Sequence, residues 1–455
     1  MPGFRQGNRR ADRDTFDRPK SKPQQRPRQK QPERKQPTES QPQPQTPSQD
    51  ADSPIDFSTP IPLSLQQLLL DVFKTALLTQ SKPTQSSIPA TDGAADSEEP
   101  APLDIKSLIQ TIKSHLYQRD FDAAFTDADS DLLRAYALRW SASRALGYAG
   151  IFKGVLGWMR NGDESSVKPL CKMEEISNTR VVCLGGGAGA EIVALAGVWR
   201  DLGLDGIDMD SLSKSTAEVS LSDAKIESGE GEDQINDAEK TTTEVETQSQ
   251  SSSRSLSVAA VDIADWSSVV ERLSKTIISN DVPFPLTSRH KPPLLARSEA
   301  LDVSFRRADL LALGEQELKD VVLGETAQES SSLLVTLMFT LNELFSTSMP
   351  KATGFLLRLT EILSPGAILL VVDSPGSYSS VKLGKNKEGE AQERKYPMKF
   401  LLDHALTSVA GGKWERVYTQ DSKWWRREAA RLRYEVGEGA GLEDMRFQLH
   451  IYQRI

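Results

Sequence analysis

The segment RVVCLGGGAGAEIVALAGVWR, which begins at residue 180, constrains the fold more than any other part of the chain. A short apolar run rich in β-branched residues is followed by clustered glycines and then by the apolar spacing of a helix. Glycine adopts positive φ in turns and lets backbone N–H groups approach a bound group closely. The segment therefore predicts a strand, a cofactor-binding turn and a helix, with Gly185, Gly187, Gly189 and Glu191 at the cofactor.

Strand-like and helix-like runs alternate over the C-terminal part of the chain. The further strand-like runs cover residues 256–262, 301–311, 331–340, 367–373, 414–420 and 446–455. Alternation of this kind predicts an α/β fold, here a Rossmann-like, seven-stranded and mostly parallel sheet with helices on both faces. The last two runs are not separated by a helix, which predicts an antiparallel C-terminal edge.

The N-terminal part has helical patterns and no strand pattern. The run LSLQQLLLDVFKTALL at 63–78 has the spacing of one amphipathic helix, and residues 103–160 contain several more. We therefore expect a helical subdomain at 61–165, with a Pro/Ser/Thr-rich linker at 80–102, followed by the sheet domain at 166–455.

The net charge of −9 conceals two opposite blocks. Residues 1–36 hold twelve Lys/Arg and four Asp/Glu, whereas residues 205–250 hold three Lys/Arg and thirteen Asp/Glu. Such segments bury too little apolar surface to offset their ordering entropy. They predict a disordered basic tail at 1–60 and a disordered acidic insertion at 205–254. The tail is either a plain solvated segment or an arm for nuclear targeting or RNA contact.

Several classes of protein are disfavoured by composition. Two cysteines, Cys171 and Cys183, are too few for a disulfide framework and predict reduced thiols in an intracellular protein. No run approaches the ~18 apolar residues of a membrane span, and the polar N-terminus is not a secretory signal. The four histidines have no metal-site spacing, and no coiled-coil heptads occur, so we expect no metal and a monomer.

Two aspartates at predicted strand ends bear on the choice of cofactor. Asp262 could accept both hydroxyls of a ribose, and Asp309 could meet an adenine amine, although either could instead cap a helix. The loop also fits a dinucleotide-binding motif, or a glycine-rich connection without a ligand. Dinucleotide dehydrogenases usually need a second domain for substrate, and here the sheet runs to the C-terminus. This arrangement favours S-adenosylmethionine (SAM).

Six blocks in order carry a resemblance to a known family. They are RWSASRALGYA (139–149), VVCLGGGAGAEIVAL (181–195), VDIADW (261–266), LMFTLNELF (337–345), VVDSPGSYS (371–379) and LEDMRFQLHIYQR (442–454). Together they resemble the fungal methyltransferases that modify N3 of a uracil in large-subunit ribosomal RNA. The resemblance implies a class I methyltransferase fold, SAM as methyl donor, an rRNA base in the pre-ribosome as acceptor, and a place in the nucleus or nucleolus, with the cytoplasm as an alternative.

Uracil N3 must lose a proton before it becomes a good nucleophile, so a general base would help. Asp373, at the end of a predicted strand, is the first candidate, and Glu343 is the second. Asn342 could hold a uracil carbonyl through its amide. For each residue the alternative is a polar group that caps a helix or stabilises a loop.

A basic segment with interleaved aromatic residues near the C-terminus is typical of RNA contact, since cations meet phosphates and rings meet bases. The predicted RNA-binding residues are Tyr378, Lys423, Trp424, Trp425, Arg426 and Arg427. An edge strand with a solvated charged face and tryptophans in the core is the alternative. Arg139, Trp140 and Arg144 form a second, weaker patch that could cover the cofactor.

Two other functions remain open on the residues alone. One is transfer of the methyl group to a protein or a small molecule. The other is a non-catalytic methyltransferase-like scaffold that binds RNA or a protein partner. Binding of SAM would discriminate against the scaffold.

Overall fold

The computed structural model describes residues 55–78, 103–118, 120–161, 178–204, 254–280, 282, 293–324, 332–376, 378–385, 391–428 and 430–455. Most of the predicted basic tail, the linker at 80–102 and nearly all of the acidic insertion lie outside these residues. Their expected properties therefore stay predictions.

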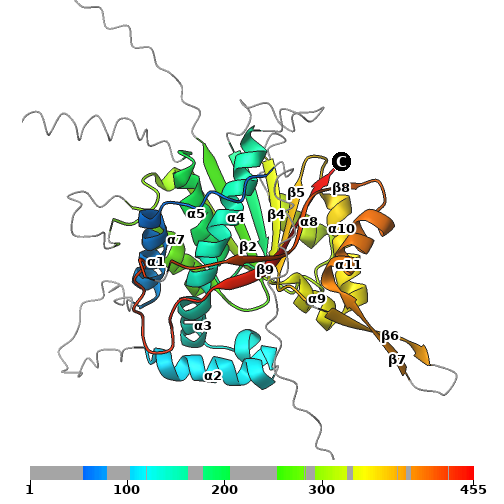
Figure 1. Ribbon diagram of the computed structural model, residues 1–455, viewed down its shortest axis with the longest axis horizontal. Helices are drawn as coiled ribbons and strands as arrows, with labels where there is room; N and C mark the ends of the chain where they lie inside the picture. Colours follow the sequence, from blue (N-terminus) through cyan, green and yellow to red (C-terminus); the bar gives the residue numbers. More distant parts are fainter. Residues whose placement is uncertain are drawn as a thin grey trace, which may run out of the picture. The chain divides into compact units, whose positions relative to one another are not determined.

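A seven-stranded sheet forms the centre of the fold (Figure 1), in the order β3-β2-β1-β4-β5-β9-β8. The strands are β1 (Asn178–Leu184), β2 (Ser255–Asp262), β3 (Leu301–Arg307), β4 (Ser332–Met338), β5 (Ile368–Asp373), β8 (Trp414–Trp425) and β9 (Met445–Arg454). β1 to β5 are parallel, and β9 runs antiparallel between β5 and β8. This topology confirms the predicted mostly parallel sheet with an antiparallel C-terminal edge.

The strand order reverses between β1 and β4, and this reversal positions the site. β1 pairs with β2 on one side and with β4 on the other. In open α/β sheets, ligands bind in the crevice that this reversal opens beyond the carboxyl ends of the strands. The glycine loop follows β1 and therefore lies at that crevice.

One face of the sheet is covered by helices from both the N-terminal part and the sheet domain. They are α1 (Leu63–Leu78), α4 (Ala142–Asn161), α5 (Ala190–Asp201) and α7 (Ser267–Ile277). The predicted helix at 63–78 is confirmed as α1. These helices share one apolar core with the sheet. The N-terminal helices α1 and α4 are therefore part of the helical layer that packs against this face. The shorter α2 (Ile105–Gln118), η2 (Asp122–Thr126), α3 (Ser130–Tyr136) and η3 (Ala137–Ser141) precede α4.

The second face buries its own apolar core. Its helices are α8 (Glu315–Leu323), α9 (Leu341–Thr347), α10 (Met349–Ile362), α11 (Met398–Asp403) and η5 (His404–Val409). A two-stranded hairpin, β6 (Tyr378–Lys385) and β7 (Ala391–Pro397), projects between β5 and α11 (Figure 1). The sequence patterns did not predict this hairpin.

The start of the described chain corrects the expected extent of the tail. Ile55 is buried, and the Phe57 ring lies 4.9 Å from the Tyr418 ring. Gly154 on α4 allows this approach, because a Cβ there would lie 2.6 Å from the carbonyl oxygen of Asp56. Ile55 and Phe57 are therefore packed against the folded chain, because their apolar side chains have a surface to cover.

Candidate active site

The loop after β1 is shaped by its glycines and by its neighbours. Gly185 and Gly189 have φ of +85° and +82°, which L side chains rarely adopt. The Gly185 N–H donates to the carbonyl oxygen of Val261 (2.7 Å), and the Gly187 N–H donates to Asp262 Oδ2 (3.1 Å). The loop is thus tied to the end of β2, and the predicted strand, turn and helix are confirmed.

Gly187→Ala should disrupt this loop. A Cβ at Gly187 would lie 2.2 Å from Trp266 Cδ1 and 2.7 Å from Asp262 Cβ. We expect a loss of roughly 1–3 kcal/mol of stability and loss of the rise in melting temperature caused by SAM. Gly354→Ala on α10 is the control, since it has ordinary φ and space for a Cβ. Differential scanning fluorimetry of both variants, with and without SAM, measures the effect; an unchanged SAM response in Gly187→Ala would contradict it.

Asp262 and Asp309 both lie at the carboxyl edge of the sheet. The Asp262 carboxylate accepts hydrogen bonds from the backbone N–H groups of Gly187 and Ala264, while burial raises its pKa. Asp309 is exposed, and its Oδ1 accepts from the Leu311 N–H (2.9 Å) in the turn after β3. The Asp262 carboxylate is therefore hydrogen-bonded to the glycine loop. Asp309 follows Ala308, whose N–H donates to the Asp262 carbonyl oxygen, and it uses Oδ1 in the turn after β3.

Glu191 lies beneath the loop. Its side chain is only 2% exposed, and its Oε1 accepts a hydrogen bond from the Thr336 hydroxyl on β4. Burial is the largest influence on this group and raises the pKa of Glu191 to about 7. This placement gives Glu191 a supporting position next to the loop, since a Cβ at Gly186 would lie 2.4 Å from its Oε2.

Glu191→Gln should change how stability depends on pH. The folded state holds the Glu191 proton more tightly than the unfolded chain, so ionisation weakens folding as pH rises from the ordinary pKa of 4.5 to about 7. At pH 8 the variant should be more stable than the wild type by up to about 3 kcal/mol, and at pH 4 the two should be alike. Urea unfolding at both pH values measures this, with Glu271→Gln on the exposed face of α7 as control. Equal pH dependence in Glu191→Gln and wild type would contradict the placement.

Asp373, at the end of β5, is held by backbone donors. Its Oδ2 accepts from the Asn342 N–H (2.9 Å), and its Oδ1 accepts from the Ser374 N–H (2.7 Å). Only 3% of Asp373 is exposed, and burial raises its pKa to about 6 against the effect of these donors. The carboxylate therefore fixes the start of α9 and the loop after β5.

A buried polar chain supports that loop from the antiparallel edge. Gln448 Nε2 donates to the carbonyl oxygen of Ser374 (2.8 Å), and Gln448 Oε1 lies 3.0 Å from His450 Nε2. His450 Nδ1 lies 2.7 Å from the Thr419 hydroxyl. Burial lowers the pKa of His450 to about 4, so the chain is neutral at physiological pH.

Glu343 lies beside Asp373 at the exposed rim of the same edge. Desolvation first, and then the nearby Asp373 charge, raise the pKa of Glu343 to about 7, while Arg144 acts in the opposite direction. The neighbouring Asn342 has a buried Oδ1 without a hydrogen-bond partner among the described residues. The edge thus combines a carboxyl whose pKa is raised toward neutrality with an amide oxygen that has no partner among the described residues.

Aromatic side chains from the N-terminal helices contact residues that follow β2 and β4. The Tyr136 ring lies 5.7 Å from Trp266, which follows β2, and Tyr148 stacks at 6.3 Å on Phe339, which follows β4. The Arg144 guanidinium lies 5.1 Å from the Phe339 ring centre and donates to the Tyr136 hydroxyl (3.0 Å). Arg144 therefore lies over the edge where the glycine loop and the acidic residues meet.

The three residues of the second predicted patch, Arg139, Trp140 and Arg144, have different contacts in the structure. Arg139 is 7% exposed, donates to the carbonyl oxygen of Gly441 (3.2 Å) and pairs with Glu443. It therefore anchors the segment before β9 and does not face the crevice. Trp140 packs against Tyr136 at 4.9 Å, and Arg144 donates to the hydroxyl of the same Tyr136.

The predicted RNA-binding residues are brought together only in part. Trp424 is 48% exposed, with the Arg426 guanidinium 3.9 Å from its ring centre, while Trp425 is half-buried. Arg427 instead donates to the carbonyl oxygen of Leu442. Tyr378 begins β6, but its side chain lies outside the described residues.

A comparison with protein families decides the class of this site. The family model Methyltransf_34, which describes SAM-dependent methyltransferases, matches residues 90–453. The chain belongs to this family. SAM is accordingly the cofactor of the enzyme, as predicted from the sequence.

This methyltransferase has a similar curated relative in Saccharomyces cerevisiae. That protein is named 25S rRNA (uridine(2843)-N(3))-methyltransferase and is 30% identical over 411 residues, which cover 89% of each chain. The relative confirms the family resemblance drawn from the six sequence blocks.

Solved structures of methyltransferases are also similar in part. An O-methyltransferase family protein from Burkholderia thailandensis has a TM-score of 0.31 at 12% identity, covering 77% of this chain and 70% of its own. A SAM-dependent methyltransferase from Methanosarcina mazei has a TM-score of 0.28 at 10% identity, covering 61% and 93%. Scores this low carry no weight beside the family match and the strand order.

The residues of this methyltransferase fit SAM. Because its glycines have no Cβ, the loop packs directly against its neighbours. The Asp262 carboxylate lies at the end of the adjacent strand. Within the described ranges, no three His, Cys, Asp or Glu side chains gather as a metal site. None of the described helices is long and apolar enough to cross a membrane.

Two features of the site were missed from sequence. Phe339 has φ of +61°, the only described residue other than glycine with positive φ, and its N–H donates to the Val372 carbonyl oxygen (2.6 Å). Such backbone strain is typical of functional sites, but no pattern in LMFTLNELF signals it. Arg144 was noted as part of a lid, and its place beside Glu343 emerges only from the packing of α4.

Proposed function

We propose that this methyltransferase transfers the methyl group of SAM to N3 of a uridine in large-subunit ribosomal RNA. The observation that carries the proposal is the placement of two carboxyls at the carboxyl edge of the sheet: Asp373 accepts from the N–H of Asn342, and Glu343 is the next residue of α9. The pKa of each carboxyl is raised by burial. Uracil N3 requires deprotonation, and a base that titrates close to the working pH is suited to remove its proton. The yeast relative's named activity supports the choice of acceptor.

Binding of the donor rests on the glycine loop and the two aspartates. Asp262 would accept the ribose hydroxyls, Asp309 the adenine amine, and the loop would hold the remainder through backbone N–H groups and close approach. SAM, when bound, supplies an electrophilic methyl group on a sulfonium. The protein's task is then to align the acceptor nitrogen with that methyl group and to exclude water.

The three residues proposed to contact the uracil, or to position those that contact it, have different roles. Glu343 is the exposed carboxyl and takes the N3 proton, whereas both oxygens of Asp373 are already held by backbone donors. This reverses the order in which the sequence ranked the two residues. Asn342 would hold a uracil carbonyl oxygen by donating from its amide Nδ2–H group.

Arg144 has an electrostatic role in this proposal. Loss of the N3 proton places negative charge on the uracil ring and its carbonyl oxygens. Arg144 lies over the edge and interacts with both Glu343 and Asp373. A fixed cation next to the developing charge stabilises it more strongly than water would, because the site is partly dry.

The substrate itself would reach beyond the crevice. Lys423, Trp424, Trp425 and Arg426 lie near the end of β8, beside the carboxyl edge of β5, and Tyr378 begins the hairpin after it. Arg427 would contribute less, since its side chain is engaged within the protein. The basic tail would add phosphate contacts or direct the enzyme to the nucleus or nucleolus, and the enzyme would act as a monomer on the pre-ribosome.

Purified enzyme with methyl-labelled SAM and large-subunit rRNA tests the proposal. Digestion of the RNA to nucleosides should place the label in 3-methyluridine. Label in protein or in a small molecule, with none in RNA, would contradict the proposed acceptor. Absence of SAM binding by calorimetry would favour a non-catalytic scaffold.

A further inference from the structure

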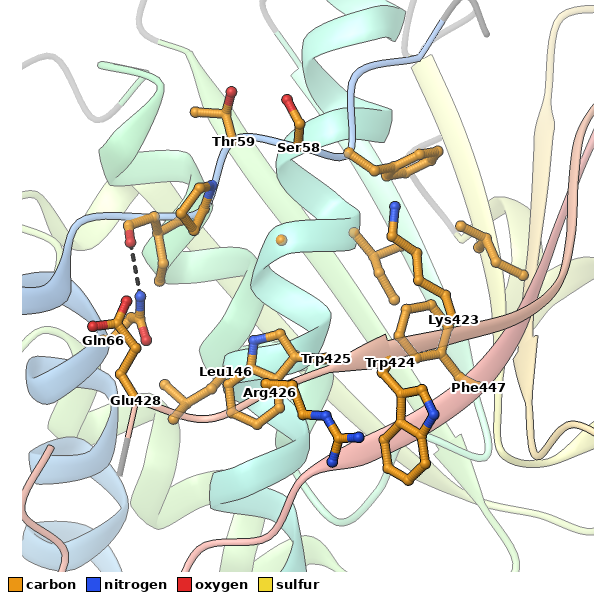
Figure 2. Close-up of a pocket in the computed structure, with 17 residues that line it drawn as sticks. Ser58, Thr59, Gln66, Leu146, Lys423, Trp424, Trp425, Arg426, Glu428 and Phe447 are labelled. Atoms are coloured by element: carbon orange, nitrogen blue, oxygen red, sulfur yellow. Dashed lines mark hydrogen bonds between the residues drawn. The ribbon is translucent and has the colours of Figure 1, made fainter. Parts of the chain in front are cut away.

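A cleft of about 260 Å³ lies apart from the glycine loop, between segments distant in sequence (Figure 2). Its walls come from residues 57–61, one face of α4, the end of β8 and the middle of β9. None of the glycine-loop residues lines it. The cleft is therefore a second concave site on this enzyme.

Small residues on α4 create the hollow. Gly147 lies so close to the C-terminal strands that a Cβ there would be 2.4 Å from the Met445 methyl carbon. Gly150, one turn later, has nothing within 4 Å of the place its Cβ would take. The helix thus packs tightly at one glycine and leaves space at the next.

The lining combines flat rings with cations. Figure 2 shows Trp424, Trp425 and Phe447 on one side, with Lys423 and Arg426 near them. Lys423 Nζ lies 5.5 Å from the Phe57 ring centre, and both Arg426 and Arg446 lie over the Trp424 ring, at 3.9 and 5.8 Å. Rings that stack on bases and cations that meet phosphates are the features with which proteins hold single-stranded nucleic acid.

The charges at the cleft favour an anionic chain. Arg426 pairs with Asp444 (2.7 Å), and Glu428 pairs with Arg431 (2.8 Å), so these acids are neutralised. Lys423, which lines the cleft, has no carboxylate partner among the residues that the structure describes. Positive charge is therefore left over where the cleft opens.

The strand register places the cleft near the acceptor site. Asp373 on β5 is opposite Gln448 on β9. The residue before Gln448, Phe447, is opposite Lys423 on β8. Neighbouring strands lie about 4.8 Å apart, so β8 is roughly 10 Å from β5 at this edge. An RNA strand that presents one base to Glu343 would extend over this distance with a neighbouring nucleotide.

We propose that this cleft is a second nucleobase subsite, which takes one unstacked base flanking the methylated uridine of the RNA substrate. The inference rests on the proposed function for the identity of the RNA. The base stacks on the Trp424 ring, and its phosphate meets Lys423. A volume of about 260 Å³ lies below the ~300–1,000 Å³ of drug-sized sites and suits one base.

Gly150→Phe tests the proposal by filling the cleft from α4. The probe is fluorescein-labelled single-stranded oligouridine, and its binding to the full chain is measured by anisotropy without SAM. Loss of base stacking predicts roughly tenfold weaker binding. Gly157→Phe is the matched control, because Gly157 lies on the same helix with equal space for a side chain and does not line the cleft. Its affinity for oligouridine should stay that of the wild type.

Abasic substitution in the probe gives the second measurement. Removing the base at a flanking position should weaken wild-type binding by the same factor and should not weaken Gly150→Phe further. Trp424→Ala, at an exposed position, should reproduce the loss even if Gly150→Phe does not fold. Unchanged affinity in both variants would overturn the subsite. Methylation of rRNA by the wild type is assayed separately, so failure of the subsite and failure of the proposed function are distinguishable.

Discussion

Glu343→Gln is expected to lower kcat for RNA methylation by roughly 10²–10⁴-fold, the usual contribution of a general base. Glutamine keeps the shape of the side chain but cannot take the N3 proton. In the wild type, the rate should rise with pH as Glu343 loses its proton, with a midpoint at the pKa of about 7, and should level off above it. The variant should show no such rise. Single-turnover methylation at pH 5.5–8.5 measures both effects.

Asp373→Asn separates the base from its support. Because the Asp373 charge raises the pKa of Glu343, its removal should shift the midpoint of the pH profile to lower pH while the rise itself persists. The rate should also fall, since one of the backbone donors from Asn342 and Ser374 loses its carboxylate acceptor. If Glu343→Gln retained the wild-type pH profile and Asp373→Asn abolished it, the roles assigned to these two residues would be exchanged.

Asp262→Ala is expected to abolish the stabilisation of the enzyme by SAM. In the wild type, SAM at 100 times its Kd should add about 2.7 kcal/mol of stability, measured as a rise in melting temperature. The variant loses both the proposed ribose acceptor and the Oδ2 that accepts the Gly187 N–H. Calorimetric titration should therefore show no SAM binding at concentrations that saturate the wild type.

Two controls keep this prediction specific. Asp309→Ala should weaken SAM binding only modestly, because Asp309 is exposed and its other oxygen is engaged in a turn. NAD should not raise the melting temperature of the wild type. A normal SAM response in Asp262→Ala would remove the aspartate from the donor site.

The parallel sheet and the donor loop were predictable because the signals that define them are local. β5 is buried at all six positions, and its five apolar residues followed by Asp373 are visible in the sequence. The glycine loop is similarly explicit, since L side chains rarely adopt the positive φ of Gly185 and Gly189. These features depend on neighbours within a few residues.

The missed features depend on contacts between distant segments. β6 and β7 are rich in charged residues and pair with each other outside the main sheet, so no apolar alternation marks them. Phe57 was assigned to the tail because the surface it covers, near Tyr418, is formed by β8. The proposed choice of Glu343 over Asp373 also depends on such contacts, because the backbone donors to Asp373 are set by how α9 begins.

The most direct test of the central claim is mass spectrometry of large-subunit rRNA nucleosides from cells with and without the gene. We predict that 3-methyluridine at one site disappears on deletion, returns with the wild-type gene and does not return with Glu343→Gln. Persistence of every 3-methyluridine after deletion would contradict the account.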